Sequence, residues 1–447
     1  MTALDDGITV DNTEGPPDPL SLFTDKGAFI APKLGAYIRD AGHIRVGVDG
    51  RLWRFHHGVY KPDGDTYARV TTRDVLGRAC RRSHFEEVIA WMRADYPSID
   101  DRPPEQWLNV RNGLLNWRTG QLEPHTPDIV SCVQFPVPWK PDATCPAIDA
   151  FLHQVAPEDA VELVYEIIGY CLYAGNPMRR AVMLLGGGRN GKSTLLRLIK
   201  ALIGEANIAA VTLQALAENR FAAAELFGKI ANIAGDLDAR AIRQTDVFKM
   251  ATGGDPIMAE RKHGHPFSFT PFATFLFSAN EAPISSDQTD AWFDRWIILP
   301  FDRRIPDDQV IPEHELDARL GAPGELAGLL VRAVHGLQNL MDRGRFDLPA
   351  SVDDAGDAYR DRLDTVRGFL AESCVLHPDA WVPRSGLYKA YRSWAKDSGR
   401  LPVSANTFYD HLKANHGAQL EIRRRRGYDG FLGLGLLAGA DTPGDDT

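Results

Sequence analysis

The stretch AVMLLGGGRNGKSTLLRLIKALIG, residues 181–204, decides the fold class. Its apolar start, Ala181–Leu185, is typical of a strand buried on both faces of a parallel sheet. Residues Gly186–Ser193 fit the pattern G-x-x-x-x-G-K-[S/T] in full, and leucines and isoleucines at helical spacing follow until Gly204. A strand, a glycine-rich loop and a helix in this order predict a phosphate-binding loop in an α/β protein.

The chemistry of this loop depends on backbone groups as much as on side chains. Glycines let backbone N–H groups turn onto phosphate oxygens, and the start of a helix favours negative charge. Lys192 would reach the β and γ phosphates, and Ser193 would offer its hydroxyl to Mg²⁺, so ATP and Mg²⁺ are the expected cofactors. The alternative, a glycine-rich turn with an unrelated lysine, is disfavoured by the flanking strand and helix. The candidate nucleotide-binding residues are Gly186, Gly187, Gly188, Arg189, Asn190, Gly191, Lys192, Ser193 and Thr194.

A phosphate-binding loop also needs a carboxylate on a neighbouring strand, for the metal and the attacking water. The run KIANIAGDLD, residues 229–238, places Asp236 at the carboxyl end of an apolar strand, 44 residues after Lys192. Ligands bind open α/β sheets at this edge. Asp236 is the first candidate for a metal ligand and Asp238 the second, and the alternative for either is a turn residue.

Two later segments supply further candidates for catalysis. The apolar run FLFSAN, residues 275–280, ends in Asn280, which could orient water or touch the γ-phosphate; the alternative is a turn former at a strand end. Arg295 stands just before the next apolar run. In an oligomeric ATPase it could reach the neighbour's site and stabilise transition-state charge, whereas the alternative is a surface ion pair. Arg303 and Arg304 compete for the same role.

Between these segments, PIMAERKHGHPFSF, residues 256–269, predicts two short strands around a polar tip. Lys262 and His263 at this tip could contact a phosphate backbone. A solvated turn is the equally weighted alternative.

Composition excludes several classes of protein. The chain has 447 residues, with 50 Lys and Arg against 60 Asp and Glu, so any DNA binding must use local basic patches. We find no apolar run approaching the roughly 18 residues of a membrane-spanning helix and no signal-peptide pattern. The five cysteines are scattered and contain no Cys-x-x-Cys pair, which disfavours a zinc site and fits a reducing cytoplasm.

One local patch lies in the C-terminal region. Residues 361–440 hold 12 Lys or Arg against 8 Asp or Glu, a local charge of +4. Helical patterns at 366–376, 386–399 and 404–417 precede two strand-like runs at 420–437, which predicts a winged-helix domain. Its third helix would enter a DNA groove while Arg423, Arg424, Arg425 and Arg426 contact phosphates; the alternative is that half of these arginines pair with acids.

The expected organisation has five segments. They are a disordered acidic arm (1–25), an α+β accessory domain (26–145), an ATPase domain with its leading helices (146–350), a winged-helix-like domain (351–440) and a tail (441–447).

The order and compactness of these motifs resemble superfamily 3 helicases, whose core is an AAA+-like P-loop NTPase. Within them the chain looks like the phage and plasmid primase-helicase family related to the poxvirus primase–nucleoside triphosphatase. Four segments are similar to sequence motifs typical of that family: GGGRNGKST, KMATGGDPIMAERKHGHPFSF, LFSANEAP and FDRWIILPF. Upstream, RFHHGVY and VRNGLLNWRTGQLEPHTP resemble its accessory domain. The similarity covers roughly residues 40 to 305.

The resemblance assigns roles to individual residues. It implies nucleotide and metal binding by Lys192 and Ser193, the acidic strand-end residue at Asp236, the sensor at Asn280, the arginine finger at Arg295 and the DNA-translocating hairpin at Lys262 and His263. The family commonly has two adjacent acids where this chain has Gly235 and Asp236, so Asp238 could share the work. About 40 residues precede the stretch that resembles the family, which are too few for a primase fold, and priming by this chain is not expected.

The leading hypothesis is an ATP-dependent DNA helicase of a phage, prophage or plasmid replication system, acting as a homo-hexameric ring in the cytoplasm of a bacterial host. A single strand would pass through the channel, the winged helix would bind the duplex origin, and a separate primase or replication factor could be recruited. The alternative is an origin-binding or regulatory ATPase that does not unwind DNA. A small-molecule kinase is disfavoured by the asparagine-tipped strand and the hairpin.

Overall fold

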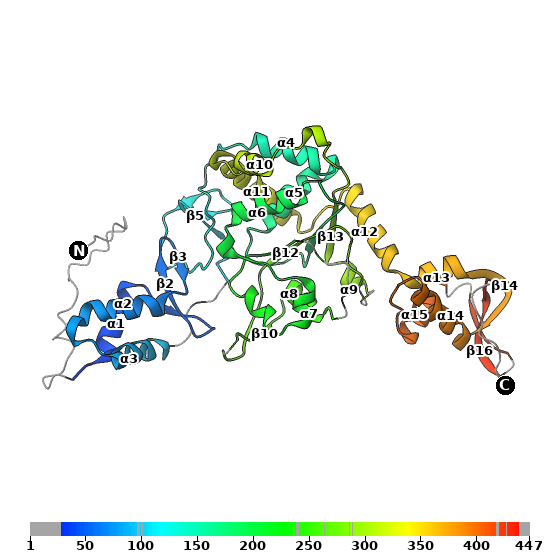
Figure 1. Cartoon of the computed structure of the whole chain (residues 1–447), viewed down its shortest axis with the longest axis horizontal. Coiled ribbons are helices and arrows are strands. Elements are labelled where there is room, and N and C mark those ends of the chain that lie inside the picture. Colours follow the sequence, from blue (N-terminus) through cyan, green and yellow to red (C-terminus); the bar gives the residue numbers. More distant parts are fainter. Residues whose placement is uncertain are drawn as a thin grey trace.

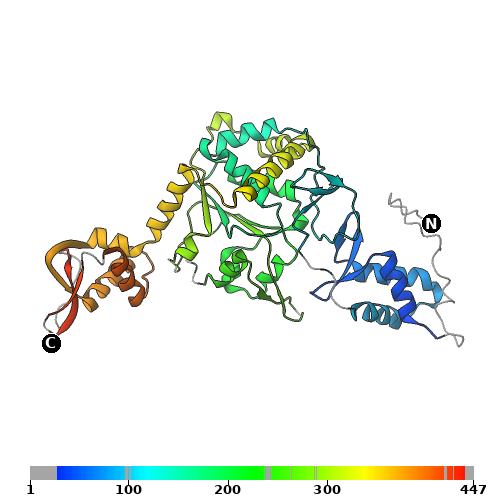
Figure 2. The same cartoon turned by 180° about the vertical axis from the view of Figure 1, so that it is seen from behind.

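A computed structural model describes most of the chain as three parts arranged in a row (Figure 1). The described residues are 28–95, 99, 102–235, 237, 242, 244–262, 264–285, 287, 289–416, 420–425 and 427–437. An N-terminal part and a C-terminal part lie on opposite sides of a larger central part, and helix α12, Ala350–Leu363, leads to the C-terminal part (Figures 1 and 2). Within the described residues, no helix is both long and apolar enough to cross a membrane.

The central part contains a five-stranded parallel sheet in the order β13-β7-β12-β9-β8. Its strands are β7 (Ala181–Leu185), β8 (Ile208–Ala209), β9 (Ala231–Ala234), β12 (Thr274–Ala279) and β13 (Trp296–Pro300). Almost every residue of these strands is buried, as the continuous apolar runs predicted. The expected α/β class with a parallel sheet is therefore confirmed.

Helices cover both faces of this sheet, as Figure 1 shows. Successive strand residues point to opposite faces, so Val182 and Leu184 join one hydrophobic cluster while Ala181 and Met183 join another. The first face is covered by α4 (Pro146–Val155), α5 (Val161–Tyr170), α6 (Lys192–Ile203), α10 (Glu313–Leu320) and α11 (Pro323–Arg343). The second is covered by α7 (Leu213–Glu218), α8 (Asp246–Gly253) and α9 (Asp290–Phe293).

Close backbone contact holds the first layer together. A Cβ on Gly169 of α5 would lie 2.1 Å from the carbonyl oxygen of Ala333 in α11, and a Cβ on Gly336 would lie 2.8 Å from that of Tyr165. Glycine at these two positions therefore lets the helices approach each other directly. Below the second layer, β10 (Ile257–Ala259) and β11 (Phe267–Phe269) form an antiparallel hairpin, as the sequence predicted.

The N-terminal part contains two small antiparallel sheets and three helices. The elements are α1 (Ala31–Ala41), β1 (Arg45–Val46), β2 (Leu52–His56), β3 (Val59–Lys61), α2 (Gly64–Leu76), α3 (Arg82–Arg93), β4 (Trp107–Val110), β5 (Gly113–Asn116) and β6 (Leu122–Glu123). The three helices and β1–β2 enclose their own core around Leu34, Ile38 and Val88. Leu108 and Leu115 of the second sheet instead join the core of the central part.

The C-terminal part has a separate aromatic core around Phe369, Tyr391 and Phe408. Its elements are α13 (Thr365–Ser373), β14 (Cys374–Pro383), α14 (Arg384–Asp397), α15 (Ala405–His416), β15 (Glu421–Arg425) and β16 (Tyr428–Leu436), with the strands in the order β14-β16-β15. The expected helix over residues 366–376 is wrong at its end. It stops at Ser373, because Cys374, Val375 and Leu376 pair with the distant strand β16.

Short 3-10 helices complete the described secondary structure, at Gly77–Ala79, Glu158–Ala160, Glu205–Asn207, Ala222–Leu226 and Asp307–Gln309.

Candidate active site

The glycine-rich loop connects β7 to α6 and depends on glycine at two positions. Gly186 has a φ of 155°, and a Cβ there would lie 2.2 Å from the carbonyl oxygen of Phe301. Gly191 caps α6 with a left-handed φ of 88°, and a Cβ there would lie 2.6 Å from Cγ1 of Val155. Any other residue would strain the backbone or displace these neighbours. Gly187 and Gly188, by contrast, face open space.

The ends of the two neighbouring strands hold this loop in place. The Gly186 amide donates to the carbonyl oxygen of Ala279 at the end of β12, at 3.2 Å. On the other side the amide of Phe301, after β13, donates to the carbonyl oxygen of Leu185 at 2.6 Å. The buried side chain of Asn190 completes the frame, because its Nδ2 donates to the carbonyl oxygen of Phe301 at 2.6 Å.

Lys192, the first residue of α6, is folded into the loop. Its side chain is buried, and Nζ donates to the carbonyl oxygens of Gly186 and Gly187 at 2.6 and 2.7 Å and to Oδ1 of Asn190 at 3.0 Å. An entering phosphate would compete with these carbonyl groups for the ammonium. Ser193 follows at an exposed position in the first turn of α6, where the helix dipole favours an anion.

A cavity of about 530 Å³ opens beside the loop. Its walls come from α4, from the start of α6 and from the segment after β13, and they include Phe151, Thr194, Ile305, Val310, Ile311 and Leu316. Two arginines at its rim are held by acids. Arg189 pairs with Asp307 at 3.0 Å, and Arg197 pairs with Asp317 at 3.0 Å. The cavity has the size and apolar lining of a small-molecule pocket.

The sequence did not reveal this cavity. Residues 305–316 contribute Ile305, Val310, Ile311 and Leu316 from among polar and proline residues, and no periodic pattern links this segment to the loop. Only the pairing of β13 with β7 brings the segment beside the start of α6.

Asn280 lies at the same edge of the sheet as the loop. Strand β12 lies between β7 and β9, and its last residue, Ala279, is level with Leu185. Asn280 follows directly and is exposed. Strand β9 also ends at this edge, since Ala234 is level with Phe277 of β12. Two predicted carboxylates, Asp236 and Asp238, lie outside the described residues.

The described residues contain no group of three or more His, Cys, Asp or Glu side chains that could hold a metal ion. The Ser193 hydroxyl is the described side chain that the loop pattern assigns to Mg²⁺, and the predicted carboxylate ligand, Asp236, lies outside the described residues. The hard oxygen donors of Ser193 and of an aspartate fit Mg²⁺.

Arg295 lies at the amino ends of the strands, whereas the loop lies at their carboxyl ends. Its carbonyl oxygen accepts from the amide of Ala181 at 2.6 Å, at the start of β7, whereas the loop begins after the end of that strand. Five strand residues therefore separate the two, about 16 Å at the usual rise. The guanidinium is half-buried against α8, donating Nε to Oγ1 of Thr252 at 3.0 Å and Nη2 to the carbonyl oxygen of Lys249 at 3.3 Å. Burial lowers the pKa of Arg295.

The two competing arginines lie on the loop side. Arg303 donates Nη1 to the carbonyl oxygen of His153 at 3.2 Å, and Arg304 lies 3.8 Å from Asp307. Ile305, the next residue, donates its amide to the carbonyl oxygen of Arg189 in the loop itself. Of the three arginines, Arg295 is thus the one that cannot reach the loop of its own chain.

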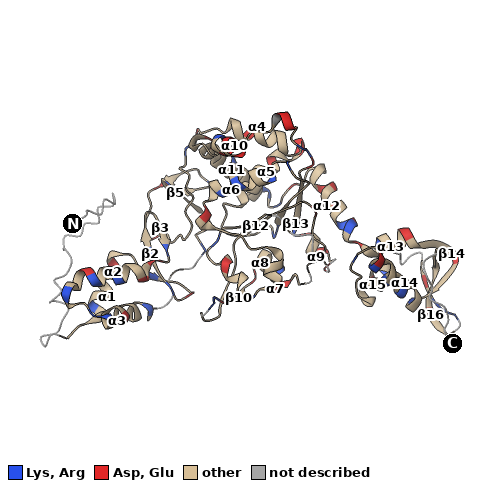
Figure 3. Ribbon diagram, in the orientation of Figure 1, with Lys and Arg blue, Asp and Glu red and all other residues tan. Residues whose placement is uncertain are grey.

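The predicted DNA contacts are exposed where the structure describes them. Lys262 is exposed in the loop between β10 and β11, while His263 lies outside the described residues. Arg423, Arg424 and Arg425 are exposed on β15, and Arg426 lies outside the described residues. Arg423 pairs with Glu421 at 3.0 Å, so one arginine does pair with an acid. Figure 3 shows Lys and Arg interspersed with Asp and Glu over all three parts of the molecule.

Three family models match separate parts of this chain. The model described as "D5 N terminal like" matches residues 23–157, and "Poxvirus D5 protein-like" matches residues 362–429. A family of unknown function, DUF5906, matches residues 184–295, which contain the glycine-rich loop and Asn280. Two of these three models are named for the poxvirus D5 protein, and they match parts of this chain on either side of the glycine-rich loop. The family resemblance seen in the motifs is confirmed.

Two viral proteins are related to this D5-like chain. "Putative helicase L207/L206" of Acanthamoeba polyphaga mimivirus is 26% identical over 209 residues, which cover 43% of this chain and 21% of that protein. "Putative helicase 121R" of Invertebrate iridescent virus 3 is 22% identical over 314 residues, which cover 62% of this chain and 33% of that protein. The D5-like chain thus spans a third or less of the length of these relatives.

Solved structures also resemble the D5-like chain. Two structures of the NrS-1 C-terminal region align with TM-scores of 0.49 and 0.47, at 12% and 10% sequence identity. The alignments cover 94% and 93% of this chain and the whole of the other.

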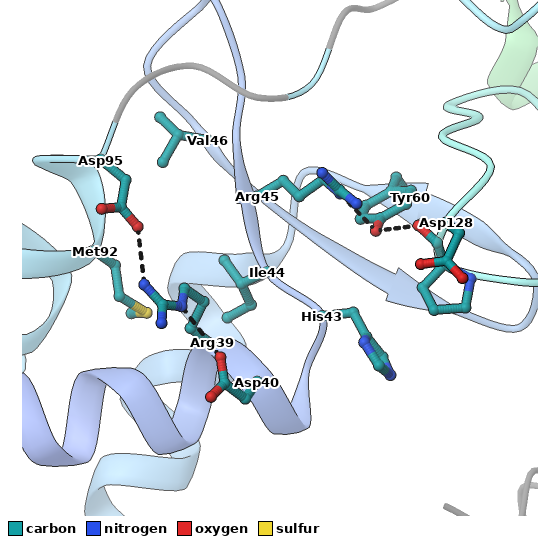
Figure 4. A pocket seen from close by; sticks show the side chains of 11 residues that line it. Arg39, Asp40, His43, Ile44, Arg45, Val46, Tyr60, Met92, Asp95 and Asp128 are labelled. Atoms are coloured by element: carbon teal, nitrogen blue, oxygen red, sulfur yellow. Dashed lines mark hydrogen bonds and ion pairs between the residues drawn. The ribbon is translucent and has the colours of Figure 1, made fainter.

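A second cavity of the D5-like chain, of about 430 Å³, lies in the N-terminal part (Figure 4). Its charged groups are held by their neighbours. Arg39 pairs with Asp40 and Asp95, each at 3.2 Å, and Arg45 donates to the hydroxyl of Tyr60 at 2.9 Å. This arrangement resembles a structural network more than a catalytic one, so the loop region is the candidate active site.

Proposed function

We propose that this chain is an ATP-dependent DNA helicase of a phage, prophage or plasmid replication system, working as a hexameric ring. One observation carries the proposal. A loop that fits the whole phosphate-binding pattern is fixed between the ends of β12 and β13, and Asn280 directly follows β12 beside it. Both relatives are named as helicases, which supports the same activity here.

The loop supports ATP binding in a defined direction. Phosphates would lie over Gly186–Thr194, where Lys192 exchanges carbonyl partners for phosphate oxygens. The nucleoside would then extend into the cavity beside Phe151 and Ile305. Mg²⁺, when bound by Ser193 and Asp236, would neutralise charge on the β and γ phosphates.

Hydrolysis would need groups from two subunits. Asn280, level with the loop, would orient the attacking water. The position of Arg295 supports a site shared between subunits. It lies at the amino ends of the strands, away from the loop of its own chain, and would contact the nucleotide in the loop of a neighbouring subunit. An arginine supplied in this way stabilises the charge that develops in the transition state.

DNA would meet the ring at two places. Lys262 and His263, at the tip of the β10–β11 hairpin, would contact one strand in the channel. The order α13–β14–α14–α15–β15–β16 supports a winged-helix domain in which α15 enters a groove of the duplex origin. Arg423–Arg426 would then contact phosphates beside it.

A second candidate function is an origin-binding or regulatory ATPase that does not unwind DNA. The separate core of residues 365–436 favours it, since a domain with its own core can bind duplex DNA independently of the motor. A separate primase or replication factor would act as a partner in either case, and priming by this chain is not proposed.

Strand displacement with a matched lysine pair tests the proposal. Lys262→Ala is expected to abolish the displacement of a labelled strand from a forked duplex, because the hairpin loses a charged phosphate contact. Lys140→Ala, which removes an exposed loop lysine of the N-terminal part, is the control and should displace the strand as wild type does. Duplex binding by wild type without any displacement would favour the regulatory ATPase instead.

A further inference from the structure

The β10–β11 hairpin would carry the DNA contact, yet it has little structure of its own. It pairs over three residue pairs, from Ile257 with Phe269 to Ala259 with Phe267. An isolated two-stranded hairpin is marginally stable in water, so the direction of its loop depends on contacts with the rest of the molecule. Whatever holds this loop therefore decides where Lys262 points.

Arg261, the neighbour of Lys262, joins this loop to the N-terminal part. Its Nη1 donates to Oδ2 of Asp49 at 3.1 Å, although 212 positions separate the two residues in sequence. The guanidinium also lies over the rings of Phe227 and Phe267, 5.3 and 4.9 Å from their centroids. Ion pairing and cation–π contact together fix the start of the loop.

Asp49 is itself held rigidly. Its side chain has no exposed surface, and its carboxylate accepts from the amide of Arg51 at 3.1 Å and pairs with the Arg51 guanidinium. Nε1 of Trp53 lies 3.4 Å from Oδ1. A Cβ at Gly47 would lie 2.6 Å from the same oxygen, so the turn is built closely around this carboxylate. Truncating a buried carboxylate of this kind leaves its cationic partners without compensation.

The turn that carries Asp49 is anchored to the central part. Trp53 belongs to the hydrophobic cluster that contains Phe227, Phe269 and Phe277. Figures 1 and 2 show the β1–β2 hairpin of the N-terminal part extending toward β10. Burial lowers the pKa of Arg261, which fits a cation held inside this contact. The loop, the turn and the sheet therefore form one packed unit.

We propose that Asp49 is a positioning residue for the DNA-contacting hairpin. It holds Arg261 and thereby fixes Lys262 in the pose from which the hairpin engages a DNA backbone. The inference rests on the proposed function, because it gives the N-terminal part a role in coupling hydrolysis to DNA. Asp49 contacts neither nucleotide nor DNA and acts through Arg261.

Limited trypsin digestion of the full chain, without nucleotide or DNA, tests the contact directly. Asp49→Asn and Arg261→Met should each speed cleavage after Lys262 roughly tenfold, since each removes a charge-assisted bond that restrains the loop. Asp95→Asn is the matched control. It makes the same chemical change at an exposed ion pair with Arg39, away from the hairpin, and should be cleaved like wild type. Wild-type cleavage rates in both variants would overturn the proposal.

DNA-stimulated ATP hydrolysis tests the functional role. Each variant should retain the wild-type rate without DNA and lose most of the stimulation by single-stranded DNA. If Asp49 acts through Arg261, the double variant should be no worse than either single variant. Additive losses would overturn the proposal, because Asp49 would then act by another route. Arg261→Met leaves Asp49 with its partners in the turn, so a folding defect confined to Asp49→Asn is recognisable.

The two claims can fail separately. If wild type shows no DNA-stimulated hydrolysis, the proposed helicase function fails, while the trypsin rates still decide whether Asp49 holds the hairpin.

Discussion

Asn190 shapes the phosphate-binding loop, and replacing it with alanine should weaken ATP binding. Its side chain is 4% exposed and makes two hydrogen bonds, one to the carbonyl oxygen of Phe301 and one from Nζ of Lys192. In the proposed function Lys192 would turn to the phosphates when ATP binds, so the bond to Phe301 would be the one that holds the loop in both states. Asn190→Ala removes it and loosens the loop that phosphates must enter.

The size of the effect follows from these bonds. A neutral hydrogen bond contributes about 1 kcal/mol and one to a charged group about 1.5–3 kcal/mol, so the variant should lose about 2.5–4 kcal/mol of unfolding free energy. The Phe301 bond alone corresponds to roughly fivefold weaker ATP binding. Titration calorimetry with ATP and Mg²⁺ measures the second quantity, and denaturant unfolding followed by fluorescence measures the first.

Asn207→Ala provides a matched control at the other end of α6. Asn207 is 6% exposed and donates two hydrogen bonds to carbonyl oxygens, those of Gln134 and Ile203, each at 2.7 Å. Its loss should destabilise the fold by a similar amount and leave ATP affinity unchanged. Equal ATP affinity in the two variants would refute the role given to Asn190.

Three further predictions concern other parts of the molecule. Arg295→Ala should bind ATP yet hydrolyse it about 10³-fold more slowly. Mixing this variant with Lys192→Ala should restore some hydrolysis, because some subunit interfaces then pair an intact loop with an intact arginine. No recovery in rings that contain both variants would contradict a site shared between subunits. Burial would raise the pKa of Asp287, but hydrogen bonds from Lys249, Thr289 and Thr245 outweigh it and hold the pKa at about 2 against the ordinary 3.8. Asp287→Asn should therefore lose about 2 kcal/mol of unfolding free energy above pH 3.8, and the difference from wild type should shrink as the pH falls toward 2; a constant difference across this range would be the contrary result. Gly169→Ala should lower the unfolding free energy by about 1–3 kcal/mol, because a Cβ would lie 2.1 Å from the carbonyl oxygen of Ala333. An unchanged melting temperature would contradict this prediction, since it would show that α5 and α11 move apart without cost.

Local sequence patterns predicted the features that depend on neighbouring residues. The glycines of the loop from Gly186 to Ser193 lie close together in sequence, so the loop pattern could be recognised without knowing any distant contact. The parallel strands were visible because burial on both faces demands continuous apolar runs. The β10–β11 hairpin was visible for the same local reason, since its two strands flank a short polar tip.

Features that depend on distant pairing were not predictable. The cavity beside the loop exists because β13 pairs with β7 and carries Ile305 to the start of α6. The contact between Asp49 and Arg261 joins residues on separate elements, and neither residue type is unusual in a turn. The first three residues of β14, Cys374–Leu376, were predicted as the end of a helix because their partners, Leu434–Leu436 of β16, are distant in sequence. Hydrophobic periodicity carries no information on such partners.

Steady-state ATP hydrolysis with and without single-stranded DNA, measured on wild type beside Lys192→Ala, tests the proposed DNA-driven motor most directly. Hydrolysis should rise with DNA in wild type and vanish in the variant, because the proposal makes the Lys192 ammonium the group that binds the phosphates. A wild-type rate that does not respond to DNA would contradict a motor coupled to DNA, and activity retained in Lys192→Ala would contradict the assignment of the site.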